Sequence, residues 1–267
     1  MVYETLKRGD YARGLEMFEN RQTRLNSKLR GLAPPEWRGQ DLTGKRILVQ
    51  GEQGLGDEIQ MARFLPRLRE LGASAVYLLC NAPNIRLLGQ LDIDYVAPRA
   101  GVVTLPDYDY WVAALSLPYL LGVRLETLSG APYLPRPAAE PGRRVGLAWN
   151  GSPNNPTDAT RSMPSAAVLD PIPDGLVLEP SGDMLDSARQ LAGLRALVTV
   201  CTSWAHLAGA MGLPTYVILS HDADWRWGLA DRTPWYSSVR LFRQDAPGEW
   251  GAPVERAAAV LRHGPLK

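Results

Sequence analysis

Short apolar runs recur along most of the chain and are separated by turn residues, a pattern typical of buried parallel strands. The clearest runs are Arg46–Gln50, Val76–Cys80, Ala196–Val200 and Thr215–Leu219. Less regular runs predict further strands at Asp94–Ala97, Tyr110–Leu115, Arg144–Trp149, Leu176–Leu178 and Val239–Phe242.

Amphipathic segments between these runs predict helices. These segments are Tyr11–Leu25, Asp57–Leu71, Asn84–Leu91, Ser165–Leu169, Asp183–Leu194, Ser203–Met211 and Val254–Arg262. Asp10 stands in the N-cap position of the first segment, and Gly72 and Gly212 stand where a left-handed residue commonly ends a helix. Strands that alternate with helices predict the α/β class, with parallel sheets covered on both faces.

A proline-rich segment, Pro132–Pro141, interrupts this alternation and is interpreted as a linker. It predicts two α/β halves, residues 33–135 and 136–267, preceded by a helical segment at residues 1–32. Ligands of such folds bind beyond the carboxyl ends of the strands. We therefore expect the functional site in a cleft between the two halves.

Charge and composition narrow the function classes. Lys and Arg number 29 and Asp and Glu 28, so a net charge of +1 provides no bulk attraction for nucleic acid or an anionic membrane. No apolar run approaches the roughly 18 residues of a membrane span, and the N-terminus lacks the apolar stretch of a secretory signal. A cytoplasmic protein is expected. Cys80, Cys201 and the histidines show no metal-ligand spacing, so the sequence requires no metal.

A glycine-rich turn follows the first strong strand, with Gly51, Gly54 and Gly56 in the order G-x-x-G-x-G-D. This order matches neither the dinucleotide fingerprint G-x-G-x-x-G nor a P-loop, which requires Lys where Asp57 stands. Asp57 is either the N-cap of the next helix or a carboxylate that accepts a proton from an attacking hydroxyl.

Hydroxyl residues at a second helix start suggest an anion site. Thr202 and Ser203 follow the strand Ala196–Val200, and His206 lies about one turn further on. Hydroxyls, unpaired N–H groups and the helix dipole together suit a phosphate or diphosphate. Arg161, at the end of the long loop Gly151–Arg161, could clamp phosphate with two N–H groups. The alternatives are a simple cap, a packed histidine and a solvated loop.

The segment Asp222–Trp227 interleaves aromatic and charged residues, and Trp235 and Tyr236 follow it. Aromatic faces and Arg in this order suit stacking on a base or sugar; the alternative is a structural aromatic cluster.

Several of these motifs together resemble a known family. The chain resembles the glycosyltransferase-like region of bacterial tetratricopeptide-repeat proteins, which are similar to the ADP-heptose:lipopolysaccharide heptosyltransferases and, more distantly, to O-linked N-acetylglucosamine transferases. The matching segments are Gly51–Gln60, Gly146–Gly151, Arg161–Pro164, Thr202–Ala210 and Asp224–Gln244, together with the repeat-like Gly9–Glu19.

The resemblance implies a GT-B fold, in which two Rossmann-like domains face a cleft and the second binds the donor. It implies an inverting, metal-independent transfer of sugar from a nucleotide-diphosphate sugar to an unknown acceptor, without a further cofactor. Asp57 would then be the base, while Arg161, Thr202, Ser203 and His206 would hold the donor diphosphate. Asn150, Asp224 and Trp225 are candidate contacts to the sugar or base.

The sequence departs from the family at Cys201, where many relatives carry Asp, and the repeat region is reduced to a short helical remnant. These departures leave two other hypotheses open: a non-catalytic nucleotide- or protein-binding scaffold that keeps the fold, and another enzyme of the same fold such as a nucleotide-sugar epimerase or hydrolase.

Overall fold

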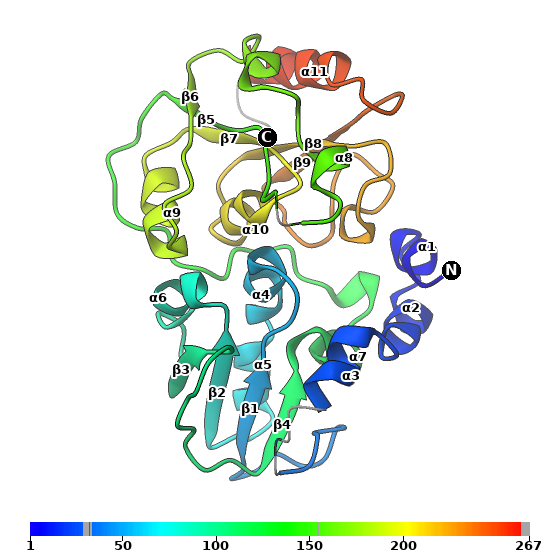
Figure 1. Ribbon diagram of the computed structural model, residues 1–267, viewed down its shortest axis with the longest axis vertical. Coiled ribbons are helices and arrows are strands. Elements are labelled where there is room, and N and C mark those ends of the chain that lie inside the picture. The colour runs from blue at the N-terminus through cyan, green and yellow to red at the C-terminus, as the bar shows by residue number, and fades with distance from the viewer. Residues whose placement is uncertain (29–31, 33, 154, 263–267) are drawn as a thin grey trace. The chain divides into compact units, whose positions relative to one another are not determined.

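A computed structural model describes residues 1–28, 32, 34–153 and 155–262, and the chain divides into two compact units. The first comprises Met1–Thr127 with Gly182–Leu185, and the second comprises Leu128–Ser181 with Asp186–Lys267. Figure 1 shows one parallel sheet in each unit. The α/β fold class predicted from the alternation of strands and helices is confirmed.

The sheet of the first unit has four parallel strands in the order β3-β2-β1-β4. Their bounds are β1 Arg46–Gln50, β2 Ala75–Cys80, β3 Tyr95–Pro98 and β4 Tyr110–Ala113. In the central register Val49 lies between Leu78 and Val112. β2 is buried along its whole length because helices and loops cover both faces, which explains its unbroken apolar sequence.

The helical elements of the first unit are short. They are α1 Val2–Lys7, α2 Tyr11–Phe18, α3 Gln22–Lys28, α4 Leu55–Ala62, α5 Leu65–Glu70, η1 Ala82–Asn84, α6 Ile85–Leu88, η2 Ala114–Ser116, α7 Leu117–Leu120 and η3 Leu125–Thr127. Asp10 caps α2 as predicted, because its carboxylate accepts the N–H of Arg13 at 3.2 Å.

Two predicted helices of this unit are broken. The segment Tyr11–Leu25 forms α2 and α3, and the break leaves the buried Arg21 between them. The segment Asp57–Leu71 forms α4 and α5, because Pro66 has no N–H to donate to the carbonyl of Ala62.

The sheet of the second unit has five parallel strands in the order β6-β5-β7-β8-β9. Their bounds are β5 Val145–Ala148, β6 Gly175–Val177, β7 Ala196–Val200, β8 Thr215–Leu219 and β9 Val239–Arg243. The central strands β7 and β8 are buried throughout. Every strand predicted for this half of the chain is present, with bounds that shift by at most one residue.

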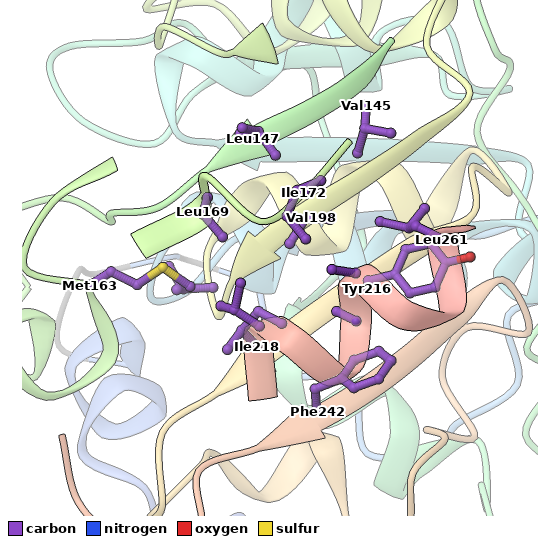
Figure 2. Packing of buried hydrophobic residues seen from close by; sticks show 14 of the residues in the cluster. Val145, Leu147, Met163, Leu169, Ile172, Val198, Tyr216, Ile218, Phe242 and Leu261 are labelled. Atoms are coloured by element: carbon purple, nitrogen blue, oxygen red, sulfur yellow. The ribbon is translucent and has the colours of Figure 1, made fainter. Parts of the chain in front are cut away.

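The helical elements of the second unit are α8 Asp158–Arg161, η4 Ala166–Leu169, α9 Met184–Ala192, α10 Ser203–Ala210, η5 Trp225–Trp227 and α11 Gly251–Arg262. Figure 2 shows its core, where Val198, Tyr216 and Ile218 of the sheet meet Leu261 of α11 and the loop residue Met163. The loop predicted at residues 150–161 ends in the helical turn α8. Residue 154 of this loop lies outside the described part of the chain.

The proline-rich segment Pro132–Pro141 packs on the second unit and is not a free linker. The N–H groups of Tyr133 and Leu134 donate to the carbonyl of Ala210 at 2.9 and 3.1 Å, and Leu134 is buried. Arg136 donates to the carbonyls of Ala192 and Leu194. The unit division between Thr127 and Leu128 thus precedes the predicted boundary at residues 135–136.

Candidate functional site

The strand order places a topological switch point in each sheet. In the first unit the chain continues from β1 to β2 on one side and later returns to β4 on the other. In the second unit β5 is flanked in the same way by β6 and β7. Loops at the carboxyl ends of such strand pairs are the usual ligand sites of open parallel sheets. The predicted site residues lie in the loops and helix starts that follow β1, β5 and β7, and in the segment that follows β8.

The glycine-rich loop after β1 brings Asp57 to the first turn of α4. This helix begins at Leu55, so Gly54 is the N-cap and Asp57 is the third helical residue. The N-cap interpretation of Asp57 was therefore wrong, because the helix starts two residues earlier than predicted. Oδ2 of Asp57 accepts the Gly54 N–H at 2.9 Å, and the side chain is half-buried.

Close packing explains the glycine at the start of this loop. A Cβ on Gly51 would lie 2.5 Å from Oε1 of Glu58 and 2.6 Å from the carbonyl oxygen of Leu79. Gln53, and not a glycine, adopts the left-handed conformation, with φ of 56°. Left-handed residues other than glycine are uncommon and often mark functional sites.

Glu58 is a buried carboxylate directly beneath this loop. It accepts the Asn81 N–H at 2.8 Å and the Asn84 side-chain amide at 2.8 Å, and Arg99 lies 3.4 Å away. Burial nevertheless raises the pKa of Glu58 to about 7, while these donors and Arg99 act in the opposite direction.

The loop after β7 leads into α10, as predicted for an anion site. Thr202 is the N-cap residue, but its hydroxyl makes no capping hydrogen bond and lies 3.4 Å from that of Thr199. Ser203 is the first helical residue and is half-buried. The N-terminus of α10 therefore presents backbone donors and a positive dipole end that Thr202 does not neutralise.

His206 is fixed in an aromatic setting one turn into α10. Its Nδ1 lies 2.9 Å from the hydroxyl of Tyr236, and its ring stacks on Trp227 with centroids 5.2 Å apart. Both partners are fully buried. The alternative of a packed histidine is confirmed, because His206 is 6% exposed and its ring is held from two sides.

Cys201 stands immediately before Thr202 and receives the indole N–H of Trp227 at 3.0 Å. Burial of the thiol and the nearby Asp224 raise its pKa to about 11, although the Trp227 N–H, Arg161 and Arg226 lower it. The thiol is therefore neutral near pH 7 and supplies no negative charge at this position.

Arg161 ends the helical turn α8 and lies against the backbone of Gly151. Its Nε donates to Oδ1 of Asp158 at 3.2 Å, and a Cβ on Gly151 would meet Nη2 at 2.7 Å. Asn150, which follows β5 closely, is exposed. β5 and β7 are adjacent parallel strands, so the loops that follow them lie at the same edge of the sheet. The positive charge of Arg161 accordingly lowers the pKa of the Cys201 thiol.

The aromatic segment after β8 is mostly buried. Trp225 is 4% exposed, the Arg226 guanidinium lies 4.7 Å above its ring, and Trp235 meets it edge to face. Asp224 keeps a side chain that is 40% exposed and pairs with Arg226 at 3.0 Å. Of these residues, Asp224 has the more accessible side chain for a ligand.

Across the described ranges, no group of three or more His, Cys, Asp and Glu side chains is arranged to hold a metal ion. Over those same residues, no helix combines the length and apolar character needed to cross a membrane.

Tyr236 contacts His206 and Trp227 contacts Cys201. The sequence did not reveal these contacts, although the segment Asp224–Gln244 contains both aromatic residues. Arg99 and Arg21 were missed altogether. Their partners are 46 and 31 positions away along the chain, and no local pattern indicates such a pairing.

Comparisons with known proteins identify one curated relative by sequence and several solved structures with a similar fold. No family model matches the sequence. The chain is 26% identical to the protein FlbA of Caulobacter vibrioides, over 95% of this chain and 53% of that protein. The chain therefore spans about half the length of this curated relative.

The solved structures that it resembles are glycosyltransferases. The iron-containing dodecameric glycosyltransferase TibC of enterotoxigenic E. coli matches 80% of this chain and 66% of its own, with a TM-score of 0.53 and 14% identity. The E. coli ADP-heptose lipopolysaccharide heptosyltransferase II matches 82% of this chain and 99% of its own, with a TM-score of 0.52 and 13% identity. The expected resemblance to heptosyltransferases, and the GT-B-like fold with two parallel-sheet units, are confirmed.

Proposed function

We propose that the protein is a glycosyltransferase that moves a sugar from a nucleotide-diphosphate sugar to an acceptor hydroxyl with inversion. The observation that carries this proposal is the start of α10, where the Thr202 side chain does not cap the helix. Arg161 lies in the segment that follows β5, the strand paired with β7 that leads into α10. A further support is a second structure of TibC, solved in complex with ADP-D-β-D-heptose, which matches with a TM-score of 0.51.

In the proposed reaction Asp57 accepts the proton of the acceptor hydroxyl. The hydroxyl oxygen then forms a bond to the anomeric carbon as the bond from that carbon to the diphosphate oxygen breaks. The Gly54 N–H on Oδ2 orients the Asp57 carboxylate for this step. One carboxylate is sufficient, because a single proton leaves the acceptor.

The departing nucleoside diphosphate carries the negative charge that develops in the transition state. We propose that Arg161, the backbone donors at Thr202 and Ser203, and His206 hold this diphosphate. Fixed donors at a helix N-terminus suit this task because they require no reorganisation as the charge develops. Asn150 and Asp224, which keep accessible side chains, remain our proposed contacts to the sugar or base. Trp225 is buried between Arg226 and Trp235, which favours the structural aromatic cluster for this residue.

We propose a nucleotide sugar as co-substrate and no resident cofactor. TibC is described as iron-containing. Among the described residues of this chain, no group of three or more His, Cys, Asp and Glu side chains is arranged to hold a metal ion. No step of the proposed reaction is therefore assigned to a metal. We also propose that the protein acts in the cytoplasm. The proposed acceptor is a glycan, a protein or a small molecule.

A thermal-shift panel tests the donor half of the proposal. Nucleoside diphosphates with adenine, uracil, guanine, cytosine and thymine bases, and their common sugars including ADP-D-β-D-heptose, are added singly. A ligand at about 100 times its Kd stabilises the folded state by about 2.7 kcal/mol, a clear shift. The same ligand should lose this effect in Arg161→Met. A flat panel contradicts the proposal.

Asp57→Asn tests the base. Asn keeps an oxygen that can accept the Gly54 N–H but cannot take a proton from a hydroxyl. We expect donor binding to persist and turnover to fall by about 100-fold or more, while Glu70→Gln, on the exposed side of α5, leaves both unchanged. Equal turnover in Asp57→Asn and wild type contradicts a base at this position.

Cys201 favours a second candidate function, a non-catalytic scaffold that keeps the fold. A neutral thiol stands where many relatives of the resembled family carry Asp, and it accepts the indole N–H of Trp227. If the panel is flat with wild type and positive with Cys201→Asp, the scaffold function is supported and the loss of activity is explained.

A further inference from the structure

Two arginines hold the glycine-rich loop after β1 from opposite sides. Arg99, directly after β3, donates from Nη2 to the carbonyl of Gln53 at 2.6 Å and from Nη1 to the carbonyl of Gly51 at 3.2 Å. Gln53 is the residue with a φ of 56°. Such a conformation persists only where the surrounding structure over-determines it, and these carbonyl bonds provide that constraint.

Arg99 is itself anchored to the helix that carries Asp57. Its Nε lies 3.4 Å from Oε1 of Glu58, and Nε and Nη2 donate to Oδ1 of Asn81 at 3.2 and 3.0 Å. Glu58 is the residue after Asp57 in α4. One guanidinium therefore connects the loop backbone to the first turn of α4.

Arg21 holds the loop from the other side. Its Nε and Nη2 donate to the two carboxylate oxygens of Glu52 at 2.9 and 2.6 Å, and the two side chains are 5% and 1% exposed. Glu52 also accepts the hydroxyl of Thr23 at 2.8 Å and the N–H of Leu115 at 3.0 Å. A buried, bidentate pair of this kind fixes geometry strongly.

This pair lies at the switch point of the first sheet. Glu52 follows β1, and Leu115 follows β4, the strand on the other side of the switch. In many open parallel sheets a ligand binds at this point. Here Arg21, from the turn between α2 and α3, donates to Glu52 and also to the hydroxyl of Ser116 at 2.8 Å.

We propose that Arg21 and Arg99 are positioning residues that together hold residues 51–54 in the conformation that presents Asp57. The helical segment at the N-terminus, which supplies Arg21, then stabilises the conformation of this loop and is not only the remnant of a repeat. The proposal rests on the function assigned to Asp57 above. Neither arginine contacts the reacting atoms; each acts through the loop.

Amide hydrogen exchange tests the loop directly and needs no substrate. We expect peptides that cover residues 51–57 to exchange about tenfold faster in Arg99→Met, while β2 keeps its protection. Arg67→Met is the matched control, because Arg67 is 58% exposed and pairs only with Glu70 among the ion pairs described. Unchanged exchange in a folded Arg99→Met variant overturns the proposal.

Arg21→Met leaves the charge of Glu52 buried and could unfold the unit for that reason alone. The double variant Arg21→Met with Glu52→Gln removes both charges, so it separates loss of the loop constraint from an unpaired charge. Faster exchange at residues 51–57 in this double variant supports the proposal, and wild-type exchange overturns the role of Arg21.

Kinetics with ADP-D-β-D-heptose then distinguish positioning from general stability. The residues proposed to bind the nucleotide sugar belong to the second unit, whereas Arg99 belongs to the first. We therefore expect kcat for ADP release to fall about tenfold in Arg99→Met with little change in KM for the nucleotide sugar. Arg99→Lys, which keeps the charge but not the two-pronged geometry, should recover only part of kcat. A change in KM alone overturns the proposal.

The two proposals fail in different ways. If wild-type protein neither binds nor turns over any nucleotide sugar, the proposed function fails, and hydrogen exchange still decides whether the arginines hold the loop. If wild type is active but loop exchange and kcat in Arg99→Met match those of Arg67→Met, only the positioning role fails.

Discussion

The buried carboxylate of Glu58 makes the stability of the first unit depend on pH. Its side chain is 1% exposed and accepts hydrogen bonds from Asn81 and Asn84. Burial raises its pKa from 4.5 to about 7, and Arg99 offsets only part of that shift. The perturbation that isolates this effect is Glu58→Gln, a neutral side chain of the same length.

The sign and size of the effect follow from linkage. Between pH 4.5 and about 7 Glu58 ionises in the unfolded chain while it stays protonated in the folded one. The unfolded state then binds fewer protons, so the free energy of unfolding falls as pH rises through this window and is constant above it. The rise of the pKa from 4.5 to about 7, at about 1.4 kcal/mol for each pH unit, amounts to about 3–4 kcal/mol.

Two measurements check this prediction. Carbon-13 NMR of the glutamate side-chain carboxyls, assigned by the loss of one resonance in Glu58→Gln, reports the pKa of Glu58 directly. Urea unfolding from pH 4.5 to 8, followed by hydrogen exchange in β1 and β2, reports the stability of the first unit. Relative to wild type, the free energy of unfolding of Glu58→Gln should rise by about 3–4 kcal/mol across the window.

Glu70→Gln is the control, because Glu70 is 59% exposed on α5 and should show no comparable change. A difference between Glu58→Gln and wild type that does not vary with pH refutes the reasoning. A difference of the opposite sign would mean that Arg99 and the amide donors outweigh burial and hold the carboxylate ionised.

Three further predictions concern packing, capping and thiol reactivity. Gly51→Ala should lower stability by about 1–3 kcal/mol in urea unfolding, because its Cβ would lie 2.6 Å from a backbone oxygen, whereas Gly251→Ala, with nothing within 4 Å, should not. Asp10→Ala should cost about 1 kcal/mol in the same assay by removing the cap of α2. Burial raises the pKa values of Cys80 and Cys201 to about 12 and about 11, so both should resist alkylation at pH 8 until the protein is denatured; rapid labelling of the native protein would contradict this.

Elements whose signal is local could be predicted from the sequence. The strands β1, β7 and β8 have the predicted bounds, because a strand buried on both faces must be apolar along its length. Gly72 and Gly212 adopt positive φ of 93° and 73° after their helices, as their positions indicated. The residues at the starts of α4 and α10 were recognised for the same reason, since they follow strong strands directly.

Helix bounds were less predictable where a single residue or a distant partner decided them. Asp57 lies inside α4 because the extended backbone of Gly54 begins the helix earlier. The break between α2 and α3 leaves Arg21 in contact with Glu52, a residue 31 positions away. Amphipathic periodicity describes one face of a helix and contains no information about such a partner.

The sequence by itself determined the class of fold, the alternation of strands and helices, and the groups that stand at the carboxyl ends of β1, β5 and β7. The tertiary structure decided what those groups contact. Cys201 meets Trp227 and His206 meets Tyr236 across 26 and 30 positions, and Arg99 reaches Gln53 across 46. Such pairs form because parallel strands that are distant in sequence end at the same edge of a sheet. A sequence pattern with a period of two or 3.6 residues identifies the buried face of one element and contains no information about contacts between distant elements.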